Sequence, residues 1–449
     1  MLRTTHVENG DLRGMPGTDP RVTAYRGIPF AAPPTGENRW RAPQPCPDWE
    51  GVLDAYTYGP ISYQETPGLG TDVYCREWHV DPEIPMSEDS LYLNVWTPAK
   101  TADEKLPVLF WIYGGGFQWG YTAEMEFDGE RLARRGIVVV TVAYRLGVFG
   151  FLCHPEITKG SPDAPANFGL LDQQAALRWV HRNIAAFGGD PERITIAGQS
   201  AGGGSVLQQL TCEENADLIS GAAIISGMIR NPNEKQDIFK PLTLEQAEKK
   251  GEEFFAFLGV KSLAEARAID SAALLDAYDR YVADHSRVFP VTDGIFSKGD
   301  ALDRLIAGEC AKVPVMAGYT KDEFVYGGVN IVQQTVHNTL KSALEKDPSR
   351  RFYCYCFGPD IPGWDDPGCF HSVDLWFFFE TLGKCWRPFA GRHFELARTM
   401  ADEFADFVKT GSPNGKGWAD TDLPEWRPFT ADDAVEMAFT SEGAVLRKV

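Results

Sequence analysis

The chain has 449 residues, and 43 Lys and Arg stand against 63 Asp and Glu, which gives a formal net charge of −20 at pH 7. Hydrophobic residues make up 43% and charged residues 24%, a composition that excludes disorder as the main state. The acidic balance excludes nucleic acid and anionic membrane surfaces as expected partners, because both require a basic patch. No apolar stretch approaches the roughly 18 residues that a membrane span needs.

The N-terminus and the cysteines both indicate a reducing compartment. The first residues, MLRTTHVENG, lack the apolar segment of a signal peptide. Nine widely scattered cysteines favour free thiols over a disulfide framework. Cys354 and Cys356 are expected on one face of a strand, with no second Cys or His pair near enough to complete a zinc site. We therefore expect a cytoplasmic protein without a metal.

In chain order, the first predicted elements are strands. Two strand-like segments, 61–65 (ISYQE) and 91–96 (LYLNVW), lie between loops rich in Pro and Gly and predict antiparallel edge strands. Short, continuous apolar runs follow at 108–112, 137–142 and 194–197. Such runs are typical of buried strands in a parallel sheet that is covered on both faces.

Helices alternate with these strands. Apolar residues repeat at helical spacing through 170–190, so a strand, a helix and a strand form a βαβ unit. Further on, 242–282 is predicted to be helical, 313–318 a buried strand and 391–410 an amphipathic helix.

No linker divides the chain. We predict one α/β domain over residues 1–449, with a large, mostly parallel central sheet flanked by helices. Antiparallel edge strands are expected near the N-terminus, and a helical insertion at about 230–290.

The strand at 194–197 leads into a G-x-S-x-G sequence with Ser200 at its centre, before a predicted helix. The glycines permit a sharp turn that holds the Ser200 hydroxyl clear of the sheet, and the helix start behind it favours negative charge. Alone this pattern is a weak signal, because a glycine-rich helix start with Ser as its N-cap has the same sequence. The preceding strand favours Ser200 as a nucleophile.

Three glycines follow the strand at 108–112, and Phe117 comes after them. Such a run exposes backbone N–H groups to the oxyanion that forms when a carbonyl is attacked. A phosphate-binding loop would usually add Lys and Ser or Thr, which are absent here. We predict an oxyanion hole formed by the N–H groups of Gly115, Gly116 and Ala201, with a plain tight loop as the alternative.

These segments and several others resemble the type-B carboxylesterases, the family that includes the cholinesterases. The most specific motif is FGGDPERITIAGQSAGGGSV at 187–206. The others are YRGIPFAAPP at 25–34, EDSLYLNVW at 88–96, YRLG at 144–147, NFGLLDQ at 167–173, PVTDG at 290–294 and TGSPN at 410–414. The resemblance implies the α/β-hydrolase fold, hydrolysis of carboxylic esters and no metal or organic cofactor, and we expect a bacterial cytosolic member.

The resemblance also implies the acid of a catalytic triad, which follows the nucleophile along the chain. After the strand at 313–318, the sequence resembles the family's G-x-N-x-x-E-G and makes Glu323 the acid. Thr320 and Phe324 depart from the pattern, because they replace its Asn and its last Gly. Asp322 is the alternative acid.

The base is implied in the same way. Residues 368–375 resemble the family's G-x-x-H-x-x-D-L, which makes His371 the general base. His337 and His393 are the alternatives. The acid is expected to hold the imidazole in one tautomer and to stabilise the imidazolium.

Departures from the family pattern bear on the substrate. Gln199 stands where most members have Glu, which removes a negative charge near the imidazolium and disfavours a cationic, choline-like substrate. Ser90 replaces a Cys that secreted members pair, in agreement with a reducing compartment. Only 47 residues separate Glu323 from His371, fewer than the family generally has. We expect an open pocket for uncharged, bulky or aromatic esters, with Phe117 and Gln199 as candidate substrate-binding residues.

We expect a carboxylesterase that works through an acyl-enzyme on a small-molecule ester. An acyltransferase or amidase with the same triad is the alternative. A non-catalytic, cholinesterase-like binding protein is a remote alternative, because all three triad positions are filled. The sequence leaves open the natural ester and whether the protein is a monomer or a dimer.

Overall fold

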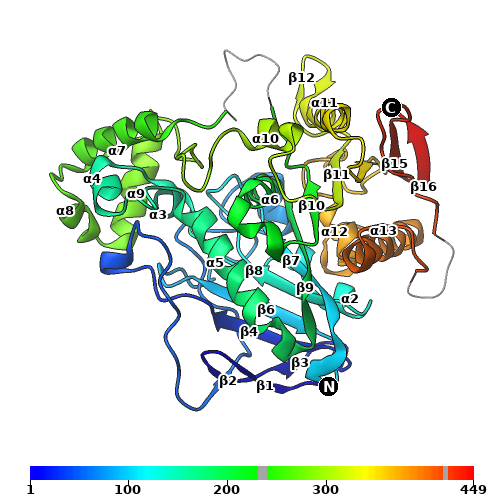
Figure 1. Ribbon diagram of the computed structural model, residues 1–449, viewed down its shortest axis with the longest axis horizontal. Coiled ribbons are helices and arrows are strands. Elements are labelled where there is room, and N and C mark those ends of the chain that lie inside the picture. Colours follow the sequence, from blue (N-terminus) through cyan, green and yellow to red (C-terminus); the bar gives the residue numbers. More distant parts are fainter. Residues whose placement is uncertain (231–239, 418–422) are drawn as a thin grey trace.

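The computed structural model describes residues 1–230, 240–417 and 423–449. Within these ranges, eleven strands form one sheet in the order β16-β15-β14-β11-β10-β9-β7-β8-β6-β4-β3 (Figure 1). The parallel strands are β7 (Leu106–Ile112), β8 (Val138–Val142), β9 (Gly189–Gln199), β10 (Gly221–Ile225), β11 (Val315–Thr320), β14 (Phe352–Phe357) and β15 (Val435–Thr440). The outer strands are antiparallel: β3 (Met15–Pro16), β4 (Thr23–Pro29), β6 (Tyr92–Thr97) and β16 (Gly443–Lys448).

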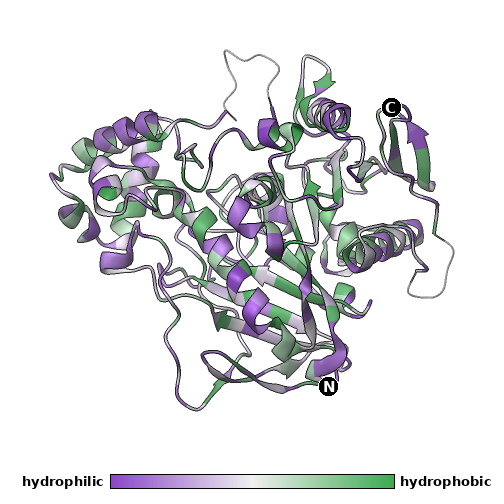
Figure 2. Ribbon diagram, in the orientation of Figure 1, coloured by the Kyte–Doolittle hydropathy of each residue, from purple (hydrophilic) through white to green (hydrophobic). Residues whose placement is uncertain are grey.

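This sheet confirms the predicted α/β fold. Figure 2 shows the central strands as mainly hydrophobic, and the side chains of β8 and β10 are buried throughout. Strands that are covered on both faces need apolar residues at every position rather than at alternate ones. The apolar runs predicted as strands at 108–112, 137–142 and 194–197 coincide with parts of β7, β8 and β9, except that β8 begins one residue later than predicted.

Helices cover both faces of the sheet. In Figure 1, α5 (Phe168–Asn183) and α6 (Ala201–Thr211) lie on one side of the strands, and α12 (Leu375–Phe378) and α13 (Gly391–Thr410) lie on the other. The amphipathic helix predicted at 391–410 coincides with α13, which ends at Gly411 in the left-handed conformation. The remaining helices of this body are α1 (Val73–Glu77), α2 (Glu130–Ala133), α10 (Ala301–Ala307) and α11 (Ile331–Lys346).

Five helices form a lobe at the left of Figure 1. They are α3 (Gly147–Phe151), α4 (Pro155–Gly160), α7 (Leu244–Leu258), α8 (Leu263–Arg267) and α9 (Ser271–Val282). The lobe has its own apolar cluster around Phe254, Phe255 and Tyr278, and Trp40 and Phe168 join this cluster from other parts of the chain. Part of the expected insertion, residues 231–239, lies outside the described residues, so its boundaries stay a prediction.

The predicted strand at 61–65 is wrong. Ile61 makes an isolated bridge to Met86, but the segment is otherwise a loop. The Gln64 side chain points inward instead of to solvent, and its amide exchanges two hydrogen bonds with the backbone of Gly120. Tertiary contacts therefore override the local strand propensity.

Smaller strands complete the fold. β1 (Thr4–Val7), β2 (Gly10–Arg13) and β5 (Val52–Asp54) form a separate sheet, and β12 (Val325–Tyr326) and β13 (Val329–Asn330) form a hairpin. In the part of the chain that the structure describes, no helix is long and apolar enough to cross a membrane.

Candidate active site

Ser200 lies in a sharp turn between β9 and α6. Its backbone angles are φ 56° and ψ −123°, a conformation that L-residues adopt rarely and at a cost in free energy. The turn depends on glycine, because a Cβ atom on Gly202 would lie 2.1 Å from the carbonyl oxygen of Ile112. Ser200 is partly exposed. Its backbone N–H donates to the carbonyl oxygen of Ile225 at 2.9 Å. The hydroxyl is therefore held at the carboxyl end of the sheet, accessible to a ligand.

Glu323 follows β11 and contacts His371, as the resemblance implied. Its Oε2 accepts a short hydrogen bond from Nδ1 of the imidazole. Its Oε1 accepts from the Ser226 hydroxyl at 2.8 Å and from the Thr320 N–H at 2.9 Å. Since Glu323 is only 2% exposed, these donors replace the water that the carboxylate loses on burial. The arrangement places the imidazole proton on Nδ1 and leaves Nε2 as the free base.

The Nε2 atom of His371 faces Gln199, the residue before Ser200. The Gln199 amide nitrogen lies 3.2 Å from Nε2 and donates a hydrogen bond to it. Within the described residues, no hydrogen bond joins the Ser200 hydroxyl to His371. The imidazole thus faces the neighbour of Ser200 rather than Ser200 itself, so Nε2 would have to exchange its partner before it could contact the Ser200 hydroxyl.

Asp322 and the other two histidines have different roles. The Asp322 carboxylate accepts from the Cys369 N–H at 2.8 Å, which ties the loop of Glu323 to the loop of His371. His393 accepts the Ala390 N–H at the start of α13, and His337 pairs with Glu436. These contacts favour Glu323 and His371 over their alternatives.

The glycine loop after β7 lies against Ser200. A Cβ atom on Gly114 would lie 3.1 Å from the Cβ atom of Ser200. Gly115 and Gly116 have φ values of 98° and 60°, which favour glycine. In the described part of the chain, the N–H groups of Gly115, Gly116 and Ala201 donate to no other residue. These three unbonded donors are available to an oxyanion.

Phe117 lies beside the first turn of α6. Its ring packs edge-on against Phe151, with 5.3 Å between the ring centroids. A Cβ atom on Gly204 would lie 3.8 Å from the tip of the Phe117 ring. Phe117 is thus near the helix that follows Ser200, whereas Gln199 contacts His371. Substrate contact by either residue stays a prediction.

Sequence reasoning missed two buried groups beside Glu323 and His371. Ser226 follows β10 in the left-handed conformation and binds Glu323, and no local signal marks it. Asp374 is fully buried, and the Tyr355 hydroxyl donates to it at 2.9 Å. Burial, followed by the charge of Glu323, raises the pKa of Asp374 to about 7. The Asp of G-x-x-H-x-x-D-L was its only sequence signal.

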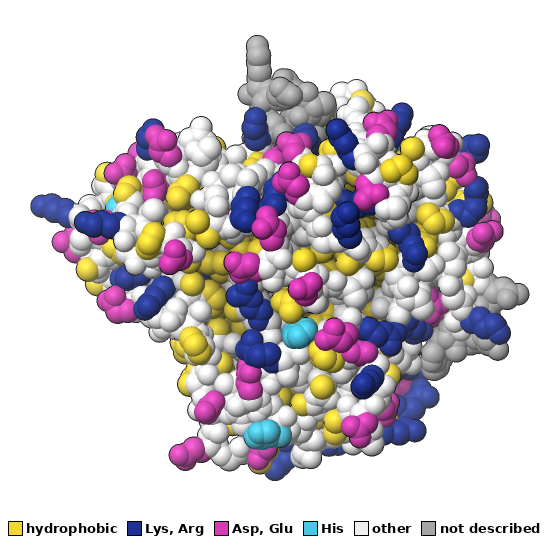
Figure 3. Space-filling view, viewed as in Figure 1, with side chains coloured by type: hydrophobic (Ala, Val, Ile, Leu, Met, Phe, Trp, Pro, Cys, Tyr) yellow, Lys and Arg dark blue, Asp and Glu magenta, His cyan; other side chains and the backbone are white. Residues whose placement is uncertain are grey.

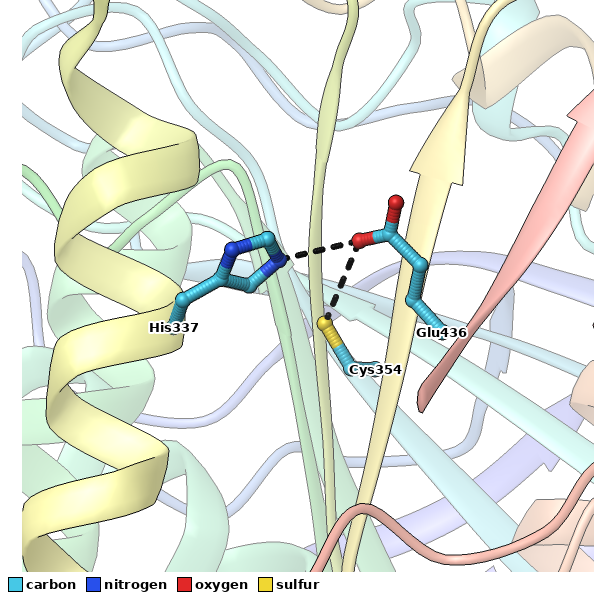
Figure 4. Close-up of side chains that lie close together, drawn as sticks. All are labelled: His337, Cys354 and Glu436. Atoms are coloured by element: carbon cyan, nitrogen blue, oxygen red, sulfur yellow. Dashed lines mark hydrogen bonds and ion pairs between the residues drawn. The ribbon is translucent and has the colours of Figure 1, made fainter. Parts of the chain in front are cut away.

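A second cluster of polar side chains joins α11, β14 and β15. His337, Cys354 and Glu436 point toward one another in Figure 4, with 2.9 Å between His337 Nε2 and Glu436 Oε2. Nitrogen, sulfur and oxygen donors of this kind suit zinc. However, the Tyr319 hydroxyl and the Arg447 guanidinium also donate to the Glu436 carboxylate, so both of its oxygens are engaged. We therefore assign the cluster to a polar network, in which the single histidine His337 lies near Cys354.

A groove of about 760 Å³ lies apart from these residues. It is lined in part by α5 and by residues 211–214, and none of Ser200, Glu323 and His371 lines it. Several of its charges are paired, for example Arg182 with Glu8. Figure 3 shows acidic and basic side chains interspersed over one whole face, so that face offers no strongly basic surface for an anionic polymer.

Residues 2–356 match the model of the carboxylesterase family. The chain belongs to this family. Among curated relatives, the para-nitrobenzyl esterase of Bacillus subtilis (strain 168) is 37% identical over 327 residues, which cover 71% of this chain and 62% of that protein. The fumonisin B1 esterase of Sphingopyxis macrogoltabida is 36% identical over 321 residues, which cover 71% of this chain and 56% of that protein. The chain thus spans about three fifths or less of the length of these relatives.

Solved carboxylesterase structures have the same fold. A Geobacillus stearothermophilus carboxylesterase at pH 6.8 superposes with a TM-score of 0.79 at 29% identity, over 99% of this chain and 97% of that one. A para-nitrobenzyl esterase gives a TM-score of 0.82 at 27% identity, over 100% and 97%. These comparisons confirm the α/β-hydrolase fold. The family match ends before His371, so its assignment as the base depends on its contact with Glu323.

Proposed function

We propose that this carboxylesterase-family protein hydrolyses carboxylic esters through an acyl-enzyme on Ser200, with His371 as general base and Glu323 as the acid that orients it. The observation that carries the proposal is the contact of His371 with a buried carboxylate on one nitrogen and with the neighbour of Ser200 on the other. This constellation suits nucleophilic attack by a serine.

In the proposed reaction, the ester displaces the Gln199 amide from Nε2 of His371, and the Ser200 hydroxyl takes its place. Ser200 attacks the ester carbonyl as His371 removes its proton, and His371 then protonates the leaving alcohol. Water, activated by the same nitrogen, then hydrolyses the acyl-enzyme, which frees Ser200 and releases the carboxylic acid product. Glu323 stabilises the imidazolium and keeps its own charge throughout.

The oxyanion that forms in both steps would be bound by the N–H groups of Gly115, Gly116 and Ala201. Donors that are already in place need no reorganisation, and loss of one typically raises the barrier by about 3–4 kcal/mol. Support comes from the absence of other partners for these groups in the described residues.

We infer that the substrate is uncharged. The amide of Gln199 is neutral where a carboxylate would attract a cation, and relatives of this chain include a para-nitrobenzyl esterase. An open pocket that accepts bulky or aromatic esters is part of the proposal, and so is action in the cytoplasm as a monomer or dimer.

Hydrolysis of p-nitrophenyl acetate, butyrate, octanoate and benzoate by the whole chain tests this function. We expect turnover by the wild type, loss of turnover in Ser200→Ala and His371→Ala, and full activity in the control His6→Ala, whose side chain is 74% exposed. Equal activity of Ser200→Ala and wild type would contradict the proposal.

The alternative of an acyltransferase or amidase is tested by product analysis. Hydrolysis predicts free acid as the main product when a competing alcohol or amine is present at millimolar concentration. A predominance of transfer product, or faster cleavage of the p-nitroanilide than of the matching ester, would favour the alternative.

A further inference from the structure

Phe324 has a backbone conformation that disfavours its own side chain. Its φ is 44°, in the left-handed region where bulky residues are genuine outliers. The carboxylesterase pattern has glycine at this position, and glycine adopts this region without strain. Since a phenylalanine is retained where glycine would relieve strain, the ring must provide something that compensates for it.

The ring of Phe324 packs against the catalytic histidine. The centroids of the Phe324 and His371 rings lie 4.7 Å apart, and the rings meet edge to face at 69°. Aromatic pairs favour this geometry. The Phe324 side chain is half-buried, and it also packs against the main apolar core.

The two hydrogen bonds of His371 leave one movement of the ring unrestrained. Glu323 binds Nδ1 and Gln199 faces Nε2, so the direction of the ring is fixed at both nitrogens. The imidazole can still tilt about the axis that joins these atoms. A second ring that packs edge to face against it opposes this tilt.

The backbone around Phe324 is held in place. Its carbonyl oxygen accepts from the Ile331 N–H at 3.3 Å, where α11 begins. The Asn330 side chain donates to the carbonyl oxygens of Thr320, at 2.8 Å, and Lys321, at 3.2 Å. Because the turn is fixed on both sides of Phe324, the ring cannot easily move away from His371.

We propose that Phe324 is a positioning residue, whose ring holds the imidazole of His371 at the tilt needed to take the proton of Ser200. The proposal rests on the proposed ester hydrolysis. It differs from a purely structural role, because it predicts that turnover falls without a matching loss of stability when the ring is replaced by glycine.

The test compares Phe324→Gly and Phe324→Tyr with wild type, by kcat and KM for p-nitrophenyl butyrate and by the midpoint of urea unfolding. In Phe324→Gly we expect kcat to fall about tenfold or more and KM to change less than about twofold, since a misplaced catalytic group slows the chemical step. The urea midpoint should change little, because relief of the backbone strain offsets the lost packing of the half-buried ring. Phe324→Tyr keeps the ring and should retain kcat within about threefold.

Lys105→Gly is the matched control. Lys105 is exposed and has φ 51°, so glycine relieves the same strain away from the site. We expect it to raise the urea midpoint without a change in kcat. If Phe324→Gly fails to fold, kcat of Phe324→Leu decides instead, because leucine keeps apolar bulk without the planar ring. We expect the same loss of kcat in that variant.

The proposal is overturned if kcat of Phe324→Gly, or of Phe324→Leu where that variant decides, lies within about twofold of wild type. It is also overturned if kcat and the urea midpoint of Phe324→Gly fall together. Failure of the proposed function is a separate result, because wild type and Ser200→Ala would then show the same rate.

Discussion

Ser226→Ala tests whether the second oxygen of the triad carboxylate matters for the reaction. The Ser226 hydroxyl donates to Oε1 of Glu323 at 2.8 Å in a fully buried position. A hydrogen bond to a charged group contributes about 1.5–3 kcal/mol. The Thr320 N–H remains bound to the same oxygen, so Glu323 keeps one partner there.

The expected loss follows from these contacts. Each 1.4 kcal/mol corresponds to about a tenfold change in rate, so a loss of 1.5–3 kcal/mol predicts a decrease in kcat/KM of roughly 10- to 100-fold. The decrease should appear mainly in kcat, because Ser226 orients the Glu323 carboxylate, which in turn orients His371. The decrease is measured from initial rates with p-nitrophenyl butyrate. Organophosphate titration gives the concentration of active sites that kcat requires.

Thr320→Val is the matched control. The Thr320 hydroxyl is buried and has no hydrogen-bond partner in the described residues, whereas the backbone N–H that binds Glu323 is unchanged by the substitution. Valine has the same shape, so kcat/KM should stay at the wild-type value. The reasoning is refuted if Ser226→Ala retains wild-type kcat/KM, or if Thr320→Val loses as much.

Four further substitutions test predictions about stability. Burial raises the pKa of Asp374 from 3.8 to about 7, so between these pH values the folded protein holds a proton that the unfolded chain releases. The free energy of unfolding therefore falls as pH rises from about 4 to about 7, by at most about 4 kcal/mol. Urea unfolding of Asp374→Asn should lack this part of the decline, and an unchanged decline would contradict it. Glu403 is buried, and both of its carboxylate oxygens lack a hydrogen-bond partner in the described residues, so burial raises its pKa well above the usual value. Glu403→Met should therefore raise the free energy of unfolding at pH 8 by about 1–3 kcal/mol, and a decrease would contradict this. On α6, Gly202→Ala should destabilise by several kcal/mol because its Cβ would meet the Ile112 carbonyl at 2.1 Å. By contrast, Gly204→Ala, with 3.8 Å to its nearest neighbour, should stabilise by about 0.5–1 kcal/mol, and equal effects of the two would refute this account.

Local patterns were enough to predict the centre of the fold. The buried strands β7, β8 and β9 are continuous apolar runs, and this pattern depends only on residues close together in the chain. The turn at Ser200 was predictable for the same reason, since its glycines adjoin the serine. The strand prediction at 61–65 failed because the Gln64 side chain binds a distant loop at Gly120, a contact that no local pattern records.

The rest of the candidate site required contacts across space. Glu323 and His371 were inferred through the family resemblance, because 47 residues separate them. The hydrogen bond from Ser226 to Glu323 was not predictable, since its residues belong to different βα connections that meet only in the folded sheet. Similarly, Gln199 was expected to remove a charge near the imidazolium, but its direct contact with Nε2 depends on side-chain direction.

Phosphorylation of the nucleophile tests the central claim most directly. Diethyl p-nitrophenyl phosphate transfers its phosphoryl group to a serine that an adjacent imidazole activates. We predict that the whole chain gains one diethylphosphoryl group, that peptide mapping locates it on Ser200, and that His371→Ala reacts at least about a hundredfold more slowly. A label on another residue, or an unlabelled Ser200 in protein that still hydrolyses esters, would contradict the account.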